Sequence, residues 1–439
     1  MSQSDNSGQV VEPSFSEAAR LWLKVGLISF GGPAAQISIL HEELVERRRW
    51  VDEQGFLTAL NFCMLLPGPE AQQLATYMGL KLHGWRGALV AGTLFVLPGA
   101  AVLFALAWLA ASLGSWPPLQ AMFKGMLPIV VALIAVAVAR IGSRTLKSPA
   151  AWALALAAFI GLAVLKIAFP WIVVGALVLG VVADRFGLTI APPAHAVEGA
   201  QAQPPANWPR IAARFAGLTA LFAVLWAVPV GLALAAAGPR PFADVAIFFT
   251  QAAFVTFGGA YAVLPFVAQG AVVHYGWLSR PEMVHGLALA ETTPGPLILV
   301  TQYVGFFAGW NAALAGHAGG LSPLAAGAIA AALTTWVTFL PCFYFVLVGA
   351  PLVERLATDR NAHAALSAVT AAIVGVIASL AVLIAEEAFL PHGKPDPLAV
   401  VIAIAAFVAA RRFKVGAAWL VGAGAVTGLA RLWLPGIAG

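Results

Sequence analysis

The feature of this sequence that most restricts its fold is a set of landmarks that it contains twice. A Phe-Gly-Gly motif, a tryptophan and a Pro-Gly-Pro motif begin at positions 30, 50 and 67, and the same three begin again at 257, 277 and 294. The offset between the two copies is identical at all three landmarks. Such constant spacing is hard to produce by chance, so we expect two homologous repeats of one duplicated unit.

Both glycine and proline landmarks predict an interrupted helix within an apolar segment. Glycine weakens a helix interior, and proline removes a backbone donor and clashes with the preceding turn. In lipid, non-helical backbone is tolerated only where it is buried in protein or lines a wet cavity. Interrupted helices at corresponding positions of two repeats are the best sequence indication of a transporter's binding site.

The composition predicts an all-α polytopic membrane protein. Of the 439 residues, 61% are hydrophobic and only 10% are charged, whereas a soluble domain carries roughly 25% charged residues. The net charge of +5 lies in short loops, and we attribute it to membrane topology rather than to nucleic-acid binding. We interpret Cys63 and Cys342 as small buried side chains, and we predict neither a metal site nor a cofactor.

The repeats set the expected domain boundaries. We predict a first repeat over 14–185, a linker with a connecting transmembrane segment over 186–242, and a second repeat over 243–436. If each Pro-Gly-Pro segment crosses once as a broken helix, the chain has about 13 transmembrane segments, and its short basic loops gather on the side of the N-terminus. The repeats are then inverted. If the Pro-Gly-Pro segments re-enter without crossing, the repeats are parallel.

The segments around the landmarks resemble the chromate ion transporter family. Residues 30–33, 65–77 and 92–99 look like its N-terminal domain, and residues 257–265 and 291–297 look like its C-terminal domain. The likeness covers nearly the whole chain and fits the long-chain, two-domain form. It implies a carrier of the bacterial inner membrane that exports chromate and confers chromate resistance, with sulfate as a related oxyanion.

The helix interruptions are the predicted substrate site. Chromate is a tetrahedral, mostly divalent anion, and helix N-termini offer such an anion free backbone amides and a partial positive charge. The alternative is that the interruptions are only packing kinks. The predicted substrate-binding residues are Lys24, Gly31, Gly32, Pro33, Pro67, Gly68, Pro69, Gln72, Gly258, Gly259, Thr292, Thr293, Pro294, Gly295 and Pro296.

Three charged residues are functional candidates, and two of them also have a structural interpretation. Lys24 is either a counter-charge for the anion or a lysine whose ammonium reaches the membrane interface. Glu70 and Glu291 flank the two Pro-Gly-Pro motifs and are candidates for proton coupling, because a carboxylate beside a dianion is unfavourable unless it is protonated. Glu70 is otherwise an ordinary first-turn acid that caps its helix.

These residues favour a secondary transporter over other classes. A sulfate or oxyanion exchanger and an anion channel are the alternatives. An intramembrane chromate reductase has less support, because the sequence has no dinucleotide fingerprint and too few cysteine and histidine ligands. The expected partners are chromate, sulfate and membrane lipid, without nucleic acid. The sequence leaves the driving force, the preference between chromate and sulfate, and the existence of a homodimer open.

Overall fold

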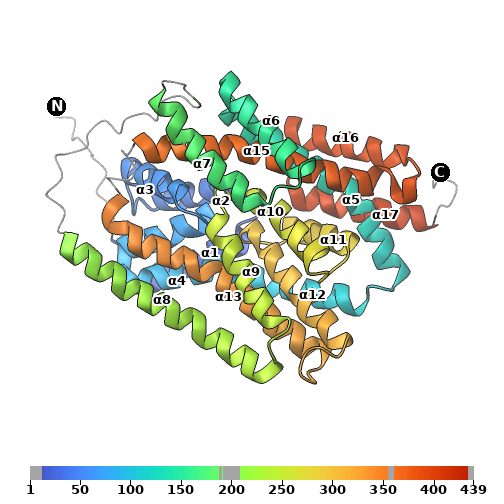
Figure 1. Cartoon of the computed structure of the whole chain (residues 1–439), viewed down its shortest axis with the longest axis horizontal. Helices are drawn as coiled ribbons and strands as arrows, with labels where there is room; N and C mark the ends of the chain where they lie inside the picture. The colour runs from blue at the N-terminus through green and yellow to red at the C-terminus, as the bar shows by residue number, and fades with distance from the viewer. Residues whose placement is uncertain (1–11, 187–189, 191–207, 354–359, 434–439) are drawn as a thin grey trace, which may run out of the picture.

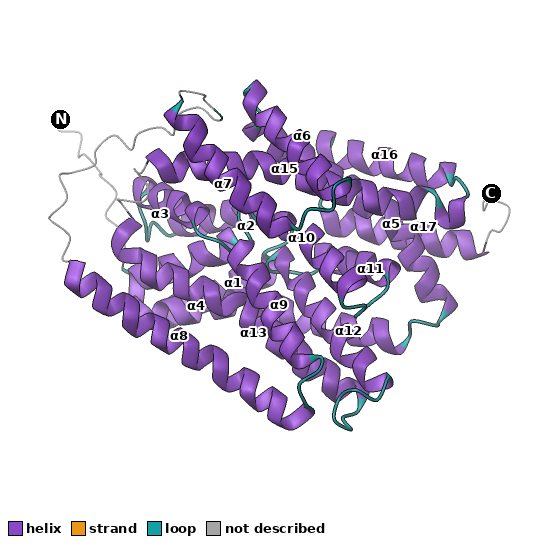
Figure 2. Ribbon diagram, in the orientation of Figure 1, coloured by secondary structure: helices purple, strands orange, loops and turns teal. Residues whose placement is uncertain are grey.

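The computed structural model describes residues 12–186, 190, 208–353 and 360–433, so most of the predicted linker lies outside the described residues. The described residues form helices and turns, with no strand among them (Figures 1 and 2). The all-α prediction is therefore confirmed for this part of the chain. The first helices are α1 (Phe15–Ile28), α2 (Gly32–His41), the π-helix η1 (Glu42–Arg47), α3 (Glu53–Leu65), α4 (Glu70–Ser112), α5 (Pro117–Thr145), α6 (Pro149–Ala163) and α7 (Phe169–Arg185).

A single helix, α8 (Trp208–Ala237), precedes the later part of the chain. In Figure 1 it runs along one edge of the molecule. The helices that follow it are α9 (Phe242–Val255), α10 (Ala260–Ala268), the π-helix η2 (Gln269–His274), α11 (Arg280–Thr292), η3 (Leu297–Leu299), α12 (Val300–Leu314), α13 (Pro323–Gly349), η4 (Ala350–Leu352), α15 (Arg360–Phe389), η5 (Pro391–Gly393), α16 (Pro397–Arg412) and α17 (Ala417–Trp433).

The chain is a multi-pass membrane protein. Among the described residues, six helical segments are long and apolar enough to cross a bilayer, which takes about 20 residues. These segments are Glu70–Ser112, Pro117–Thr145, Pro209–Ala237, Leu297–Leu314, Pro323–Leu352 and Asn361–Phe389. Shorter apolar helices accompany them, such as Pro149–Ala163 and Ala417–Trp433.

The helix boundaries recur at fixed offsets. The helices α1 and α9, α3 and α11, and the π-helices η1 and η2 each begin and end at the same offset as the repeated sequence landmarks. The offset is larger between α5 and α15, which start at 117 and 360. It is larger again, and equal, for α6 with α16 (149 and 397) and for α7 with α17 (169 and 417). Element by element, the later part of the chain follows the order of the first.

Glycines with left-handed backbone mark the helix interruptions. A residue with a side chain adopts positive φ at a cost of about 1–2 kcal/mol, so glycine is the residue that turns the chain there. The φ values are 89° at Gly31, 79° at Gly32, 126° at Gly68, 74° at Gly258, 92° at Gly259 and 92° at Gly295.

Each Pro-Gly-Pro segment folds back as a hairpin. The Lys81 ammonium, near the end of the first half of α4, lies 2.7 Å from the position of a Cβ built on Gly55 at the start of α3. In the later part of the chain, Asn311 Nδ2 near the end of α12 donates to the Trp277 carbonyl just before α11, at 2.9 Å. A helix that continued straight through the interruption would hold these residues more than roughly 30 Å apart, at about 1.5 Å per residue. The contacts therefore contradict a single crossing of each Pro-Gly-Pro segment.

The two Gly-Gly segments fold back as well. Lys24 Nζ on α1 contacts Glu43 Oε1, beyond α2, at 2.7 Å. The ring of Phe248 on α9 lies 5.6 Å from the ring of Trp277, beyond α10 and η2. The two arms of each hairpin therefore point back toward one side.

The helix α4 consists of two helices joined by a tight turn. His83 and Gly84 have non-helical backbone, and His83 Nε2 lies 3.0 Å from the Pro13 carbonyl oxygen beside the start of α1. The two halves pack so closely that a Cβ on Gly79 would overlap the carbonyl of Gly87. The first half thus completes the Pro-Gly-Pro hairpin, and the second half is a full-length span.

The last helices of each part pack on a long helix of the other part. The helices α6 and α7 contact α15, α16 and α17 contact α5, and α5 and α15 contact each other. Small residues allow the close approach: Gly375 of α15 faces Ala155, and Gly125 of α5 faces Gly424 and Gly428. Such pairs are the usual means of helix association in lipid. The two parts of the chain therefore form one interlocked body.

The hairpins predict which loops share a side of the membrane. We expect a membrane-impermeant thiol reagent to label Gln54→Cys and Arg86→Cys from one side and Pro281→Cys from the other, in right-side-out and inverted vesicles. All three positions are exposed, whereas Cys63 and Cys342 are buried and give little background. Labelling of Gln54→Cys and Arg86→Cys from opposite sides would contradict the hairpin and show that the first Pro-Gly-Pro segment crosses the membrane once.

Candidate functional site

The four helix interruptions meet in the interior and are joined by two equivalent hydrogen bonds. The Gly68 amide donates to the Thr256 carbonyl at 2.6 Å, and the Gly295 amide donates to the Ser29 carbonyl at 2.9 Å. Positions 29 and 256, and positions 68 and 295, are related by the offset of the repeated sequence landmarks. Figure 1 accordingly draws α1, α2, α9 and α10 in the middle of the molecule. Each Pro-Gly-Pro motif is therefore bound by the Gly-Gly interruption of the other part of the chain.

Hydroxyl groups satisfy the helix ends beside these bonds. Ser29 Oγ donates to the Val25 carbonyl and Thr256 Oγ1 donates to the Ala252 carbonyl, both at 2.6 Å. Both side chains are fully buried. The last carbonyls of a helix have no partner within it, so a serine or threonine here removes the cost of burying one of them.

Each Pro-Gly-Pro motif also rests against a long helix of the other part. A Cβ built on Gly68 would lie 2.9 Å from Cys342 Sγ on α13. A Cβ built on Gly295 would lie 3.6 Å from the Cα of Gly99 on α4. A glycine at position 99 and a small cysteine at position 342 therefore let the two motifs approach these helices.

Three half-helices begin around one carboxylate. Glu70 is the first residue of α4, and a Cβ built on Gly259, the N-cap of α10, would lie 3.8 Å and 4.0 Å from its two carboxylate oxygens. Pro33, in the first turn of α2, has its Cγ 4.0 Å from the same point. The N-termini of α2, α4 and α10 thus converge, and the role of these residues in substrate binding stays a prediction.

The Glu70 carboxylate has no hydrogen bond or ion pair to any other described residue. The side chain is half-buried, and it sits close to the N-terminus of a helix that belongs to the other part of the chain. Glu291 is different, because it is buried and accepts a hydrogen bond from the Tyr261 hydroxyl at 2.6 Å. Arg140 of α5 also acts on Glu291 electrostatically. The two candidate proton carriers therefore have unlike surroundings.

Glutamines occupy the buried space beside the interruptions. Gln72 Nε2 donates to Thr76 Oγ1 at 3.1 Å, and Gln73 Nε2 donates to the Pro67 carbonyl at 2.7 Å. The side-chain oxygens of both have no partner among the described residues. Gln36 Nε2 bridges the carbonyls of Ser29, at 3.3 Å, and Gly295, at 2.6 Å.

Sequence reasoning missed Gln36 and Tyr261 as site residues. Both are polar side chains near the start of the apolar half-helix that follows a Gly-Gly interruption, and that position was the available signal. Thr292 and Thr293 flank the second Pro-Gly-Pro motif as expected, but both hydroxyls donate to the Leu289 carbonyl of their own helix.

Lys24 is engaged by a carboxylate of its own hairpin. Its ammonium pairs with Glu43, which also accepts from Arg47 at 3.1 Å and from Arg48 at 3.4 Å. Burial opposes ionisation of Glu43, but the hydrogen bonds and charges of Lys24 and Arg48 outweigh it, so its pKa lies below the ordinary value. The role of Lys24 as an anion ligand stays a prediction.

The contact between Gly99 and the second Pro-Gly-Pro motif can be tested by stability. A Cβ at Gly99 would overlap the Pro294 carbonyl oxygen, so we expect Gly99→Ala to cost about 1–3 kcal/mol, as overpacking does. Thermal unfolding of the purified protein should show a lower midpoint. Gly422→Ala is the control, since a Cβ there meets nothing within 4 Å. Equal midpoints for the two variants would contradict the packing described here.

The sequence was compared with protein families and with known proteins. The profile of the chromate transporter family matches residues 16–181 and 243–429. A chromate transport protein of Pseudomonas aeruginosa is 32% identical over 87% of this chain and 84% of its own length. A probable chromate transport protein of Synechococcus elongatus is 28% identical over 90% of each chain. No solved structure matches the chain.

The chromate transport protein of Cupriavidus metallidurans is also similar, with 26% identity over 84% of this chain and 82% of its own length. These relatives span both parts of the chain, and the family profile covers both groups of interrupted helices. The chain belongs to the chromate transporter family.

Proposed function

We propose that the protein is a secondary transporter that exports chromate across the bacterial inner membrane and thereby confers chromate resistance. The proteins of Pseudomonas aeruginosa and Cupriavidus metallidurans, to which it is similar, are named chromate transport proteins, which supports transport rather than enzymatic chemistry. The structural observation that carries the proposal is the meeting of four helix interruptions inside the protein. Non-helical backbone at membrane depth is typical of transporter substrate sites.

The repeats of the proposed transporter span 14–185 and 243–436 and are inverted. Both hairpins of each repeat enter from one side and return to it. The expectation that re-entrant Pro-Gly-Pro segments make the repeats parallel assumed that each Gly-Gly segment crosses. Because the Gly-Gly segments fold back as well, five complete crossings separate α1 from α9. These crossings are the second half of α4, α5, α6, α7 and α8. An odd number of crossings inverts the second repeat. With α13, α15, α16 and α17 the proposed topology has nine complete crossings, instead of about 13 segments.

The proposed substrate site lies between the N-termini of α2, α4 and α10. A tetrahedral dianion there would accept hydrogen bonds from free backbone amides of the first turns. The partial positive charge of each helix end, roughly half an elementary charge, would offset part of the dianion's charge. Sulfate shares this shape and charge, so it would enter the same site as a competitor or as an exchanged ion.

Glu70 decides the charge balance of this site. An anion beside Gly259 would lie about 4 Å from the Glu70 carboxylate, since a Cβ there is 3.8 Å from Oε1. Two unit charges at that distance repel by roughly 4 kcal/mol at an effective dielectric constant near 20. That repulsion equals nearly three powers of ten in affinity, at about 1.4 kcal/mol per tenfold. We therefore infer that the anion binds when Glu70 is protonated, which couples transport to protons.

Transport itself can be tested with the purified protein in liposomes. We expect labelled chromate to accumulate when a pH gradient or internal sulfate is imposed, without a change in its oxidation state. Accumulation driven only by internal sulfate would identify an oxyanion exchanger, and dissipative flux without accumulation would identify a channel. Formation of trivalent chromium by the protein would contradict the transporter.

Glu70→Gln should separate binding from coupling. Because the amide cannot ionise, we expect chromate binding to persist and to lose its dependence on pH. In the wild type, binding should weaken as pH rises, since ionised Glu70 repels the anion. Accumulation driven by a pH gradient should be lost in the variant.

Glu17→Gln is the matched control, because Glu17 is an exposed first-turn acid of α1. The control should keep the wild-type pH profile and accumulation. If Glu70→Gln behaves as Glu17→Gln does, Glu70 is only a helix cap.

A further inference from the structure

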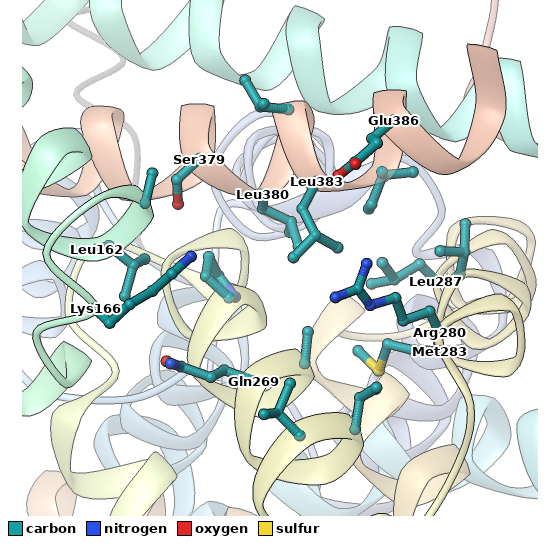
Figure 3. Close-up of a pocket in the computed structure, with 18 residues that line it drawn as sticks. Leu162, Lys166, Gln269, Arg280, Met283, Leu287, Ser379, Leu380, Leu383 and Glu386 are labelled. Carbon is teal, nitrogen blue, oxygen red and sulfur yellow. The ribbon is translucent and has the colours of Figure 1, made fainter. Parts of the chain in front are cut away.

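A second site for an anionic group lies away from the helix interruptions. A cavity of about 440 Å³ is enclosed by the turn after α6, by α10 and η2, by α11 and by α15 (Figure 3). Its walls include apolar side chains such as Leu287, Leu380 and Leu383. Val273 and Val382, which also line it, are 70% and 57% exposed. The cavity therefore opens on an apolar outer surface of a membrane protein.

Two cations from different elements point into this cavity. Figure 3 shows the Lys166 ammonium and the Arg280 guanidinium directed into the space between the helices. Neither side chain forms an ion pair with another described residue. Glu282 is the nearest acid on the helix of Arg280. Its carboxylate already accepts hydrogen bonds from the amide and the hydroxyl of Ser279, the N-cap of that helix. Both cations thus remain available to a ligand.

The charge of the cavity favours an anion. The carboxylate of Glu386 on α15 also lines it, which leaves one excess positive charge from two cations and one anion. Two like charges that point into the same space repel each other, and an anion between them relieves this repulsion. Gln269 and Ser379, which face the same cavity, can add hydrogen bonds.

We propose that this cavity binds a tetrahedral oxyanion group between Lys166 and Arg280. The group is either the phosphate of a lipid headgroup, whose acyl chain would follow the apolar walls, or a free dianion such as sulfate. Basic cavities between transmembrane helices are known binding places for anionic lipid headgroups. The proposal does not depend on transport at the helix interruptions, because the site is separate and is tested by binding.

The internal repeat supplies a matched control. Lys414 occupies the turn after α16 that corresponds to the turn of Lys166 after α6, and both have left-handed backbone, with φ of 54° and 56°. The position that corresponds to Arg280, the first residue of α11, is Glu53, the first residue of α3. The Glu53 carboxylate lies 2.7 Å from His41 Nε2. The equivalent positions therefore hold a lysine and a glutamate, in place of the two cations at this cavity.

Binding can be measured in two arms on the full-length protein. The first arm is equilibrium binding of labelled sulfate to detergent-purified protein. The second is native mass spectrometry after equilibration with phosphatidylglycerol or with phosphatidylcholine. We expect the Lys166→Gln/Arg280→Gln double variant to lose roughly 10- to 30-fold in affinity in at least one arm, at about 1 kcal/mol for each cation. Lys414→Gln should match the wild type.

The two arms identify the source of the oxyanion. If the double variant loses binding of phosphatidylglycerol alone, the site belongs to a lipid headgroup. If it loses binding of sulfate, the site belongs to a free dianion. Glu386→Gln should strengthen binding in the same arm, because it removes the only carboxylate found among the described residues that line the cavity. If the double variant binds both ligands as the wild type and Lys414→Gln do, the proposal is wrong. That result would not contradict the proposed chromate transport or the proposed role of Glu70 in it.

Discussion

The structure depends on two backbone hydrogen bonds that cross between the halves of the chain. An interrupted helix leaves amides and carbonyls without partners, and in a membrane interior water does not supply them. Here the amide of each Pro-Gly-Pro glycine finds the carbonyl just before the opposite Gly-Gly motif. These two amides are satisfied by the other half of the chain and not by their own hairpins, so the backbone of one half needs the other half. This requirement explains why the four interruptions gather at one place.

A nearly symmetric backbone carries asymmetric side chains. At the offset of the repeated landmarks, Glu70 of the first half corresponds to Leu297 of the second, and Glu291 corresponds to Met64. The backbone positions that form the reciprocal bonds are kept in both halves, whereas each carboxylate occurs once. In the proposed site, backbone geometry would therefore supply the general capacity to receive an anion. The two carboxylates therefore give the interruptions of the two halves different chemistry.

The sequence was sufficient for the local structure of the site and insufficient for its long-range contacts. Gly-Gly and Pro-Gly-Pro predicted the interruptions because glycine and proline act on the backbone within one turn. Whether the chain continues or turns back depends on contacts such as that between Asn311 and Trp277, and no short segment encodes them. Lys24 shows the same limit, since Glu43, its partner, lies 19 residues away across the fold.

The hairpins also improve the agreement between the proposed topology and the distribution of basic residues. A single crossing of each broken helix puts the arginines at 47–49 on the outer side, where short loops are usually poor in basic residues. Because the Lys24–Glu43 and Lys81–Gly55 contacts return the hairpins to their starting side, these arginines join the basic turns near Arg86 and Arg144 on the inner side. Arg280 moves to the outer side by the same argument. It then lies beside Lys166 in the cavity of Figure 3, as the structure has it. Because α7 and α8 each cross once between Lys166 and Arg280 in this topology, the two residues share a face of the membrane only if the second Gly-Gly segment folds back instead of crossing.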